Sequence, residues 1–515
     1  MKIKFYGHNC YVLEGKSVNI ITDPWLSNSG AFFGSWFQWP INHHCMSNLL
    51  NDIQKNKKNF LYISHEHQDH FDKKTLKEIR PHVSTCIIPK YHDSYLKDQI
   101  TKLGYKVIEL NDHEKYNISE KDFIELMIVD TGVTHDSAAI IHIDNKIFVN
   151  QNDCKIFDRL VYLEEMKVDY YAVQFSGASW HPVCYSIKEE EKKIISNKKV
   201  QSKFTSIRNA LNLIKPKYYL PSAGPAIFPF LDPSLSFGED NIFVHQPKIE
   251  DFFSNSNTQI VFMRPGENFE SSLKNPPINP PTLDELKSLK DSLSCSFFKY
   301  KDTELNIRAL KKQISARLDQ IKDIKFSRCP LLFFKWGKQG LKIDLNKGSI
   351  EDTFLKTNSL KVDYVSIEAT PSYFSLMANP NFRWQDIYLS LRTNIKRNPD
   401  VFNTFINIFL FSDLSNIREG FKTTLSINDQ RILIVNPYNG KNYEINRFCP
   451  HNGADLKNAK IDQQNNLICP RHSWMFDLEN EGKCKTANVT IKSEEIEENI
   501  TICESISGRL LKIVN

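Results

Sequence analysis

The stretch that decides the fold is residues 60–70, which read FLYISHEHQDH. Its first four residues form an apolar run of strand length, and the histidine-rich segment follows at once. A strand that ends abruptly before a helix directs the side chains of the connecting loop into one crevice. The spacing therefore predicts a metal site in which His65 and His67 face one ion, while Asp69 and His70 face a second. A histidine-rich surface loop is the alternative interpretation.

Imidazole and carboxylate ligands together suit zinc, and they suit iron equally well. The H-x-H-x-D-H run resembles the metallo-β-lactamase superfamily. That resemblance implies three further site residues: Asp23 in TDPWL beneath the site, His135 in VTHDSAA as the third histidine of the first ion, and Asp153 in NQNDC as the bridging carboxylate. Asp136, beside His135, is alternatively a residue that orients an imidazole.

The last metal ligand is less well defined by the sequence. The superfamily supplies a late histidine, and His245 in IFVHQ and His181 in SWHPV are both available. We favour His245, because it lies late in the domain, after the loop Pro221–Pro225. His181 stays open as the alternative.

The first 265 or so residues alternate β-rich runs with helical patterns, which indicates layered α and β structure. Helices are expected at Lys73–Ile79 and Thr205–Leu213. The predicted strands are Ile3–Tyr6, Tyr11–Leu13, Val18–Thr22, Phe60–Ile63, Thr85–Ile88, Val107–Leu110, Phe123–Val129, Ala138–Ile143, Lys146–Val149 and Tyr171–Phe175. With the superfamily resemblance, this region is expected to form an αββα sandwich over residues 1–270.

A proline-dense break, Asn275–Pro281, ends the first domain, because such a run fits neither a helix nor a central strand. Residues 271–417 then predict a helical and α+β middle region. Leu283–Ile324 has amphipathic helical spacing, LLFFKWG and GLKIDL are strand-like, Val362–Glu368 adds a strand, and Asp386–Phe411 is expected to be mainly helical. This pattern resembles the small lipid-carrier-like modules that follow some metallo-β-lactamase-type domains.

Two loops near the C-terminus read CPH and CPRH, so each offers one thiolate and one imidazole. Structural zinc sites usually pair cysteines two to four residues apart. A C-x-H loop matched by a C-x-x-H loop is instead the pattern of a Rieske [2Fe–2S] centre, in which Cys449 and Cys469 hold one iron and His451 and His472 hold the other. A zinc ribbon or unligated thiols are the alternatives.

The surroundings of these loops favour the Rieske interpretation. Residues 418–515 are strand-rich and punctuated by turns, so an all-β domain is expected. Respiratory Rieske loops carry an extra disulfide-forming cysteine each, whereas Asn452 and Ser473 stand beside the ligands here. The cluster is therefore expected to be of the oxygenase or ferredoxin type. Altogether the chain is predicted to be an α+β multidomain protein.

Composition narrows the class of protein. The 515 residues carry 66 Lys+Arg against 61 Asp+Glu, a net charge of +5 without a basic stripe, so no nucleic-acid partner is expected. Apolar runs are too short to span a bilayer, and no membrane partner is expected. Met1–Tyr6 resembles a strand rather than a signal peptide, and eleven cysteines then suggest thiols or metal ligands. The cytoplasm is the expected compartment.

The two ligand sets together predict an activity. A Rieske cluster moves single electrons, whereas zinc has no redox chemistry, so their coexistence favours one or two non-haem iron ions in the first site. We expect an oxidoreductase, an O2-dependent monooxygenase or hydroxylase, that inserts oxygen into a small organic substrate. The residues predicted to be catalytic are His65, His67, Asp69, His70, His135 and Asp153. Since no Rossmann fingerprint or P-loop occurs, the electrons are expected from an external reductase or small carrier.

Several longer stretches resemble the CMP-N-acetylneuraminate hydroxylase family. They are TDPWL, YISHEHQDHFDKKTL, DSAAIIHIDNKIFVNQNDC, KPKYYLPSAGP and DIYLSLRTNIKRNPDVFNTF, and the resemblance spans most of residues 1–410. That family combines a Rieske domain with a metallo-β-lactamase-like domain and hydroxylates the N-acyl group of a sugar nucleotide. The animal enzymes have the Rieske domain first, whereas here it is last. The resemblance implies a related hydroxylase, with a sugar nucleotide or amino sugar as a possible substrate.

Two other activities fit parts of the chain. The H-x-H-x-D-H loop alone also suits a metal-dependent hydrolase or lactonase, in which a metal-bound water is the nucleophile. The C-terminal loops alone suit an electron carrier or redox sensor. A carrier, however, has no need of the ligand set at residues 65–70.

Overall fold

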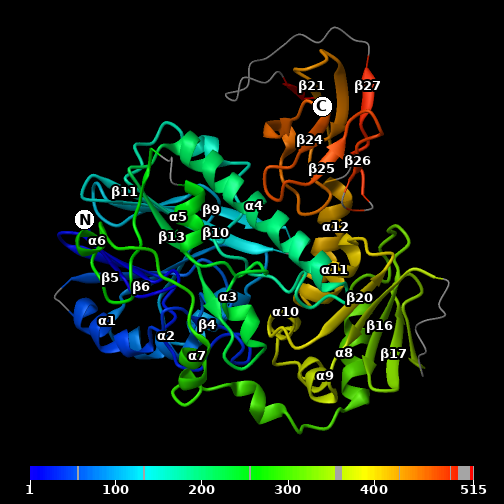
Figure 1. Ribbon diagram of the computed structural model, residues 1–515, viewed down its shortest axis with the longest axis horizontal. Coiled ribbons are helices and arrows are strands. Elements are labelled where there is room, and N and C mark those ends of the chain that lie inside the picture. The colour runs from blue at the N-terminus through cyan, green and yellow to red at the C-terminus, as the bar shows by residue number, and fades with distance from the viewer. Residues whose placement is uncertain are drawn as a thin grey trace.

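The computed structural model describes residues 1–54, 57–131, 134–253, 257–353, 362–427, 430–485, 487, 489–496 and 511–513. Three parts follow one another along the chain: a sandwich of two sheets, an α+β part and a small β-rich part (Figure 1). The predicted α+β multidomain class is confirmed. The predicted divisions after residues 270 and 417 stay predictions.

Two sheets face each other in the first part. Within the described ranges the first has the order β1-β2-β3-β5-β6-β7, and the second has the order β15-β13-β12-β11-β10-β9-β8. The first sheet contains β1 (Lys2–Phe5), β2 (Tyr11–Glu14), β3 (Val18–Thr22), β5 (Lys58–Tyr62), β6 (Thr85–Pro89) and β7 (Val107–Leu110). The second contains β8 (Lys115–Asn117), β9 (Phe123–Asp130), β10 (His135–Ile143), β11 (Lys146–Asn152), β12 (Tyr170–Gln174), β13 (Tyr218–Ser222) and β15 (Gln259–Ile260). β4 (Phe37–Gln38) and β14 (Ala226–Ile227) pair separately.

Alternation along the strands divides their side chains between two apolar layers. In β5 and its extension, Phe60 and Tyr62 pack between the sheets, while Leu61 and Ile63 pack on the outer side. Each of these four side chains is fully buried. Because burying one such side chain contributes about 1.5–3 kcal/mol, the outer layer needs a cover of helices as much as the inner layer needs the second sheet.

Helices cover both outer faces. α1 (Met46–Ile53), α2 (Lys73–Ile79) and α3 (Tyr95–Lys102) pack on the first sheet, and α2 has the predicted bounds. α4 (Glu189–Ile214) and α5 (Pro247–Phe253) cover the second sheet. The sequence predicts only Thr205–Leu213 of α4. Its opening turn is instead stabilised by the acidic residues Glu189–Glu191 at the positive end of the helix dipole, which the apolar pattern does not reveal.

The middle part is a five-stranded sheet, within the described residues, packed against helices around one large apolar cluster. Its strands are β16 (Leu331–Trp336), β17 (Gln339–Asp344), β18 (Ser349–Thr353), β19 (Tyr364–Glu368) and β20 (Asn394–Asn398). Its helices are α8 (Ile307–Asp319), α9 (Pro371–Ala378), α10 (Trp384–Leu389), α11 (Thr404–Phe411) and α12 (Ile417–Ile427); the short α6 (Phe269–Ser272) and α7 (Leu283–Leu289) precede them.

Two predictions for this part need correction. Residues 386–411 are not mainly helical throughout, because β20 interrupts them and pairs antiparallel with β19. The segment NIKRN has one buried apolar residue, Ile395, so pairing with its neighbour rather than its own pattern makes it a strand. The helical pattern over Leu283–Ile324 is divided between α7 and α8.

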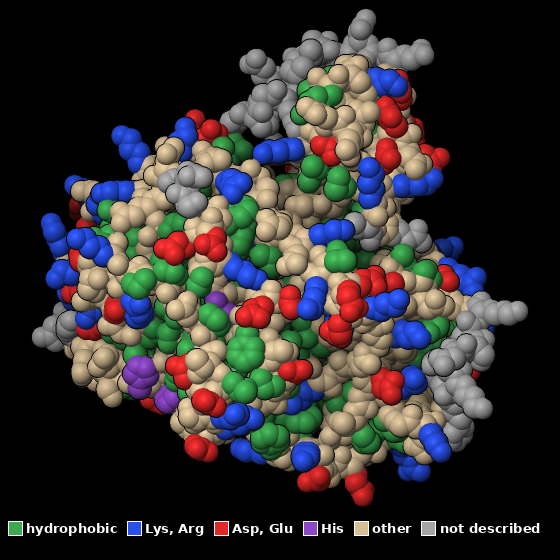
Figure 2. Space-filling view, viewed as in Figure 1, with side chains coloured by type: hydrophobic (Ala, Val, Ile, Leu, Met, Phe, Trp, Pro, Cys, Tyr) green, Lys and Arg blue, Asp and Glu red, His purple; other side chains and the backbone are tan. Residues whose placement is uncertain are grey.

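The C-terminal part contains two four-stranded sheets within the described residues, of orders β27-β22-β21-β28 and β23-β24-β25-β26. Their strands are β21 (Arg431–Val435), β22 (Asn442–Asn446), β23 (Lys460–Ile461), β24 (Asn466–Ile468), β25 (Met475–Asp477), β26 (Lys483–Cys484), β27 (Glu494–Ile496) and β28 (Leu511–Ile513). This part forms a distinct lobe, on a face where acidic and basic side chains are interspersed (Figure 2). None of the helices in the described ranges combines the length and apolarity needed to cross a membrane.

Candidate metal centres

The H-x-H-x-D-H loop joins β5 to α2 and is held in a tight turn. The backbone N–H groups of His70 and Phe71 both donate to the carbonyl oxygen of His67, at 3.0 and 2.7 Å. Asp72 then caps α2 by accepting from the backbone N–H of Lys74. His65 Nε2 lies 2.7 Å from His67 Nδ1. The turn therefore brings the predicted ligands together in a buried pocket at the end of β5.

Asp23 lies beneath this loop, as the superfamily resemblance implies. Its Oδ1 accepts the backbone N–H of Ser64 at 2.8 Å, and its Oδ2 lies 2.8 Å from His70 Nδ1. Asn9 Nδ2 also donates to Oδ2, at 2.7 Å. Because Asp23 accepts a hydrogen bond from Nδ1–H, His70 presents Nε2 as the atom free to bind a metal ion. Asp23 thus orients a ligand rather than acting as one.

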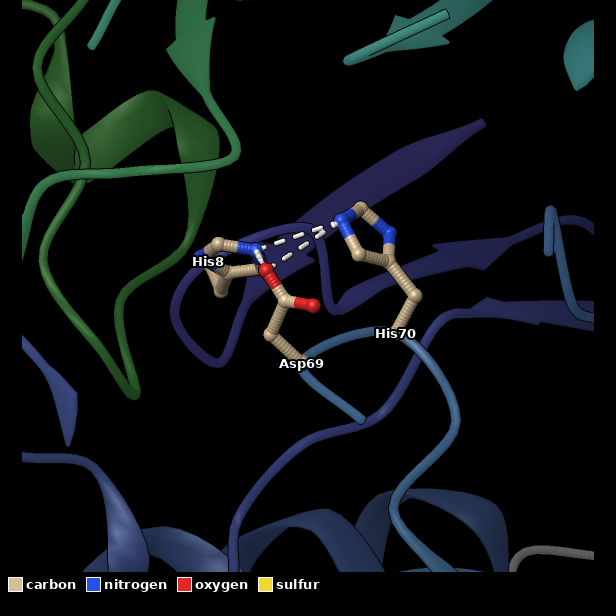
Figure 3. Close-up of side chains that lie close together, drawn as sticks. All are labelled: His8, Asp69 and His70. Carbon is tan, nitrogen blue, oxygen red and sulfur yellow. Dashed lines mark hydrogen bonds and ion pairs between the residues drawn. The ribbon is translucent and has the colours of Figure 1, made fainter. Parts of the chain in front are cut away.

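His8 completes a ligand group that the sequence does not predict. From the loop after β1 it points toward Asp69 and His70, which come from the loop after β5 (Figure 3). His8 Nε2 lies 3.2 Å from Asp69 Oδ2 and 3.3 Å from His70 Nε2. Gly7 holds the turn with φ +103, where a Cβ would come within 2.7 Å of Asn42 Nδ2. A Gly-His pair directly after the first strand of the sheet is the sequence feature that could have indicated it.

Asp153 lies between the two ligand groups. It forms a group with His65 and His67, and its Oδ1 is 3.4 Å from His70 Nε2 and 4.0 Å from His65 Nδ1. The residue follows β11, from the opposite sheet. One carboxylate that approaches both groups has the position required of a bridging ligand, which is the role predicted for Asp153.

The charges and unpaired atoms of the pocket fit metal ions. Asp69 Oδ1 and Asp153 Oδ1 are buried without a hydrogen-bond partner in the described part of the chain. Burial opposes ionisation of Asp69, yet His70 and His8 keep its pKa well below the usual range. Burial lowers the pKa of His67 to about 4, so this imidazole is neutral and able to bind a metal at neutral pH. Imidazoles and carboxylates in this combination suit zinc or non-haem iron.

The structure does not bring His135 into either group. Its Nε2 lies 3.4 Å from Asp130 Oδ1, its Nδ1 lies 3.5 Å from Glu66 Oε1, and its ring stacks on Tyr91. It forms a separate cluster with Asp130 and His92. Burial lowers the pKa of His135, but the surrounding carboxylates of Glu66, Asp130 and Asp93 raise it to about 9. Its predicted role as a metal ligand stays a prediction, and the geometry gives it a carboxylate-lined pocket instead.

Asp136, the residue after His135 in β10, faces the metal pocket. Its Oδ1 lies 3.3 Å from His65 Nδ1. Successive residues of a strand point to opposite faces, so in β10 only one of the pair can face the pocket. Burial raises the pKa of Asp136 to about 7, an effect that His65 partly offsets. The alternative that Asp136 orients an imidazole therefore has direct geometric support.

The two candidates for a late ligand lie elsewhere. His245 Nε2 is 2.8 Å from the carbonyl oxygen of Ser236, and burial lowers its pKa to about 4. His181 packs edge-on against Tyr185 and is likewise kept neutral by burial, which lowers its pKa to about 2. Neither belongs to a group of potential ligands among the described residues. The assignment of a late histidine as a ligand stays a prediction, and His8 is an additional histidine that joins a ligand group.

The middle part closes the pocket from the side. Arg383 Nη2 donates to Glu66 Oε1 at 2.7 Å, and Gln68 Nε2 donates to Asp386 Oδ2 at 3.0 Å. Arg383 and Asp386 are both less than 10% exposed. The non-ligand residues of the H-x-H-x-D-H loop are thus fixed by α10 and the residue before it.

The C-terminal loops form a second centre with matching turns. The N–H of Cys449 donates to the carbonyl of Ala454 at 2.9 Å, and the N–H of Cys469 donates to the carbonyl of Trp474 at 2.8 Å. Both thiols are 1% exposed, and the two hydrogen-bond to each other. The rings of His451 and His472 lie 4.5 Å apart.

This centre fits a Cys2His2 cluster. His451 Nδ1 is buried without a hydrogen-bond partner among the described residues, which suits an iron ligand. Its ring stacks on Trp474 at 4.1 Å and meets Phe402 at a right angle. Burial lowers the pKa of His451 to about 3, so the imidazole is neutral as a ligand must be.

Both cluster loops rest on the first domain of the same chain. Arg471 donates to both oxygens of Asp158, at 2.9 and 3.0 Å, in a pair that is almost fully buried. On the other cluster loop, Asn452 Oδ1 accepts from the hydroxyl of Thr131, which follows β9, at 3.0 Å. His472 Nε2 lies 3.1 Å from Lys155 Nζ, and Lys155 is two residues from Asp153. The two candidate centres are therefore neighbours across the domain interface.

Comparisons with known proteins identify both domains. Residues 407–495 match the model of the Rieske [2Fe-2S] domain, and residues 2–148 match that of the β-lactamase superfamily domain. The C-terminal Rieske domain, its [2Fe–2S] cluster and the N-terminal metallo-β-lactamase fold are thus confirmed. The resemblance to the CMP-N-acetylneuraminate hydroxylase family stays a prediction.

Three relatives illustrate the range of similarity. A protein of Mycolicibacterium smegmatis, provisionally named a Rieske 2Fe-2S iron-sulfur protein, is 25% identical over 94% of this chain and 98% of its own. A similarly named protein of Mycobacterium tuberculosis is 24% identical over 95% of this chain and 98% of its own. A 4-amino-L-phenylalanyl-(CmlP-peptidyl-carrier-protein) 3-hydroxylase of Streptomyces venezuelae is 28% identical over 24% of this chain and 23% of its own.

Proposed function

We propose that this protein is a Rieske-coupled non-haem iron oxygenase, a hydroxylase that inserts oxygen from O2 into a small organic substrate. One observation carries the proposal: His472 Nε2 contacts Lys155, two residues from Asp153, and Asp153 approaches both groups of metal ligands. A cluster that moves single electrons has a use beside a metal site only if that metal changes oxidation state. Zinc does not, whereas iron does.

The chain's own residues have definable tasks in such a reaction. Asp23 fixes the tautomer of His70, and Arg383 holds the loop through Glu66. The Arg471–Asp158 pair keeps the cluster loops against the metal domain. When bound, iron in the first site would supply dioxygen activation and the [2Fe–2S] cluster would supply electrons. Hydroxylation uses two electrons and two protons and releases the second oxygen atom as water.

The relatives support the reaction class more than the substrate. The Streptomyces venezuelae relative is named as a hydroxylase, and its similarity covers about a quarter of each chain. The sequence resemblance to CMP-N-acetylneuraminate hydroxylases suggests a sugar nucleotide or amino sugar as the substrate. We propose this class as the first to screen.

The electrons would come from an external donor. We propose a reductase or a small electron carrier that docks on the Rieske domain, with NAD(P)H as at most an indirect source. A reducing cytoplasm suits the free, buried thiols of Cys10, Cys45, Cys86 and Cys154.

Metal content with EPR spectroscopy tests the proposal. Protein made in iron-replete cells and purified without oxygen should contain about four irons per chain and give a reduced Rieske signal. Stoichiometric zinc in the first site, without oxygen consumption, would overturn it. The metal-dependent hydrolase is then the better interpretation, and multiple turnover that survives Cys449→Ser would support that alternative.

A further inference from the structure

Three lysine side chains converge where the two centres meet. Lys155 follows Asp153 in the loop after β11, while Lys199 and Lys203 lie four residues apart and therefore on one face of α4. Helix α4 crosses the molecule below the Rieske domain (Figure 1), and its Ser202 donates to Ser473 beside the cluster ligand at 2.8 Å. All three lysines are half-buried, so a small solute can reach them.

The hydrogen bonds of these lysines go to neutral acceptors. Lys199 Nζ donates to the carbonyl oxygen of His181 at 2.8 Å. Lys203 Nζ donates to the carbonyl oxygen of Ser176 at 2.7 Å and to the amide oxygen of Gln174. Each ammonium group has three donors, so both retain unused hydrogen-bonding capacity in these contacts.

The three lysines lack acidic ion-pair partners in the part of the chain that the structure describes. Among the described residues no carboxylate forms an ion pair with any of the three, whereas Lys192 and Lys193, earlier on α4, pair with Glu189 at 2.9 Å and Asp240 at 2.8 Å. Burial, then the charges of Lys155 and Arg397, lower the pKa of Lys199 to about 7. Crowded ammonium groups without an anion disfavour one another's charged form.

The metal site does not supply the missing charge. Asp153, two residues from Lys155, and Asp136 both face the metal-site histidines. Metal cations bound there would neutralise them. The oxidised Cys2His2 cluster is itself neutral, because two ferric ions balance two sulfides and two thiolates. With both centres loaded, the three amino groups therefore lack a nearby negative charge, and an anion bound among them would stabilise their charged form.

We infer that Lys155, Lys199 and Lys203 form a binding site for an anionic group of the substrate, a carboxylate or a phosphate, between the metal site and His472. The inference rests on the proposed function only for the identity of the occupant as the substrate. An anion held here is adjacent to both centres at once. Its arrival is transmitted to the cluster through the contact between Lys155 and His472.

Anion binding to the metal-loaded protein tests the inference. Inorganic phosphate and acetate are titrated separately, by calorimetry and by the EPR spectrum of the reduced cluster, so that the two arms distinguish a phosphate from a carboxylate site. The variant Lys199→Gln/Lys203→Gln should weaken binding of the preferred anion at least about tenfold, as expected for loss of a charged hydrogen bond. The control Lys198→Gln alters an exposed neighbour on α4 and should change binding less than about twofold.

Charge rather than shape is tested by Lys203→Arg, which should retain most of the binding and the EPR shift. Two results overturn the inference: neither anion binds at millimolar concentration, or binding persists unchanged in the double variant, which would assign the anion to the metal ions. The outcome is separable from the proposed function. Lysine-dependent anion binding in a protein that natively holds zinc would leave this site standing while the oxygenase assignment fails.

Discussion

The two metal centres of this chain differ in the charge of the side chains around them. In the first, burial lowers the pKa of His70, but Asp153 and Asp69 raise it to about 9. In the second, burial lowers the pKa of His451 to about 3, and the positive charge of Lys155 adds to the effect. Carboxylates surround the imidazoles of the first centre, and lysines lie near the two imidazoles of the second.

This difference determines what each centre can hold. The acidic pocket attracts bare divalent cations, whose charge its carboxylates neutralise. The thiolate and imidazole set suits a cluster whose oxidised form is neutral and which needs no carboxylate. The two sites can therefore be loaded independently, although they lie side by side. The predictions below test that independence.

Loss of one cluster ligand should have the largest effect. Cys449→Ser is expected to abolish the Rieske EPR signal and the visible absorption, because one iron loses a thiolate that serine cannot replace. The metal content of the first site should stay unchanged. Cys484→Ala, a control in the same domain, should keep the full signal, and its loss there would show that the domain, not the ligand, had failed.

Replacement of His8 tests whether this residue is a metal ligand of the first site. His8→Ala should lower the metal content by about one ion per chain while the cluster signal persists, because the group with Asp69 and His70 loses one of its three members. His245→Ala is the matched control and should retain all metal, since its ring contacts a backbone carbonyl. Metal analysis of both proteins decides the matter. Retention in His8→Ala with loss in His245→Ala would restore the late histidine as the ligand.

How much was predictable follows from where the ligands lie in the chain. The Rieske ligands occupy two short loops, and four metal-site residues occupy one turn, so spacing alone defines them. His8 follows β1, which lies in the same sheet as β5 but far from it in strand order, whereas Asp153 follows β11 in the opposite sheet. Asp153 could be predicted from family order. For His8 the only sequence signal is the Gly-His pair after the first strand, and no local pattern states that this loop reaches Asp69 and His70.

The same reasoning explains the errors in the elements. Predictions succeeded where buried apolar residues repeat with the period of the element, as in α2 and β3. They failed at β20, whose residues are mostly polar and whose conformation comes from pairing with β19. At His135 the sequence alone does not decide, because the choice between His135 and Asp136 depends on which face of β10 points inward. A shift of one residue along a strand reverses every side chain.

Loss of the Arg471–Asp158 ion pair should have the next largest effect, on the free energy of unfolding. Asp158→Ala leaves a buried guanidinium without its partner, which costs about 3–5 kcal/mol of unfolding free energy. Arg447→Met, which removes the more exposed Arg447–Asp455 pair of the same domain, should cost less than about 1 kcal/mol. Chemical denaturation monitored by fluorescence measures both. Equal stabilities would show that the interface does not hold the Rieske domain in place.

The pH dependence of stability is expected to show the smallest effect. It tests whether His135 is a protonated residue among carboxylates or a metal ligand. Its pKa in the folded protein is raised to about 9, against an ordinary value of about 6.5, by Glu66, Asp130 and Asp93. The stabilising effect of its charge is thus fully present below about pH 6.5 and is lost as the pH rises through about 9. It amounts to at most about 3 kcal/mol.

His135→Gln removes this titration, so the difference in unfolding free energy between the wild type and the variant should shrink from pH 6 to pH 9.5. Urea denaturation at several pH values measures it, and metal analysis of the same variant should show an unchanged content. A metal ligand would behave in the opposite way. Its imidazole is neutral when bound, so replacement would release metal, and the stability difference would grow with pH as protons stop competing for the site.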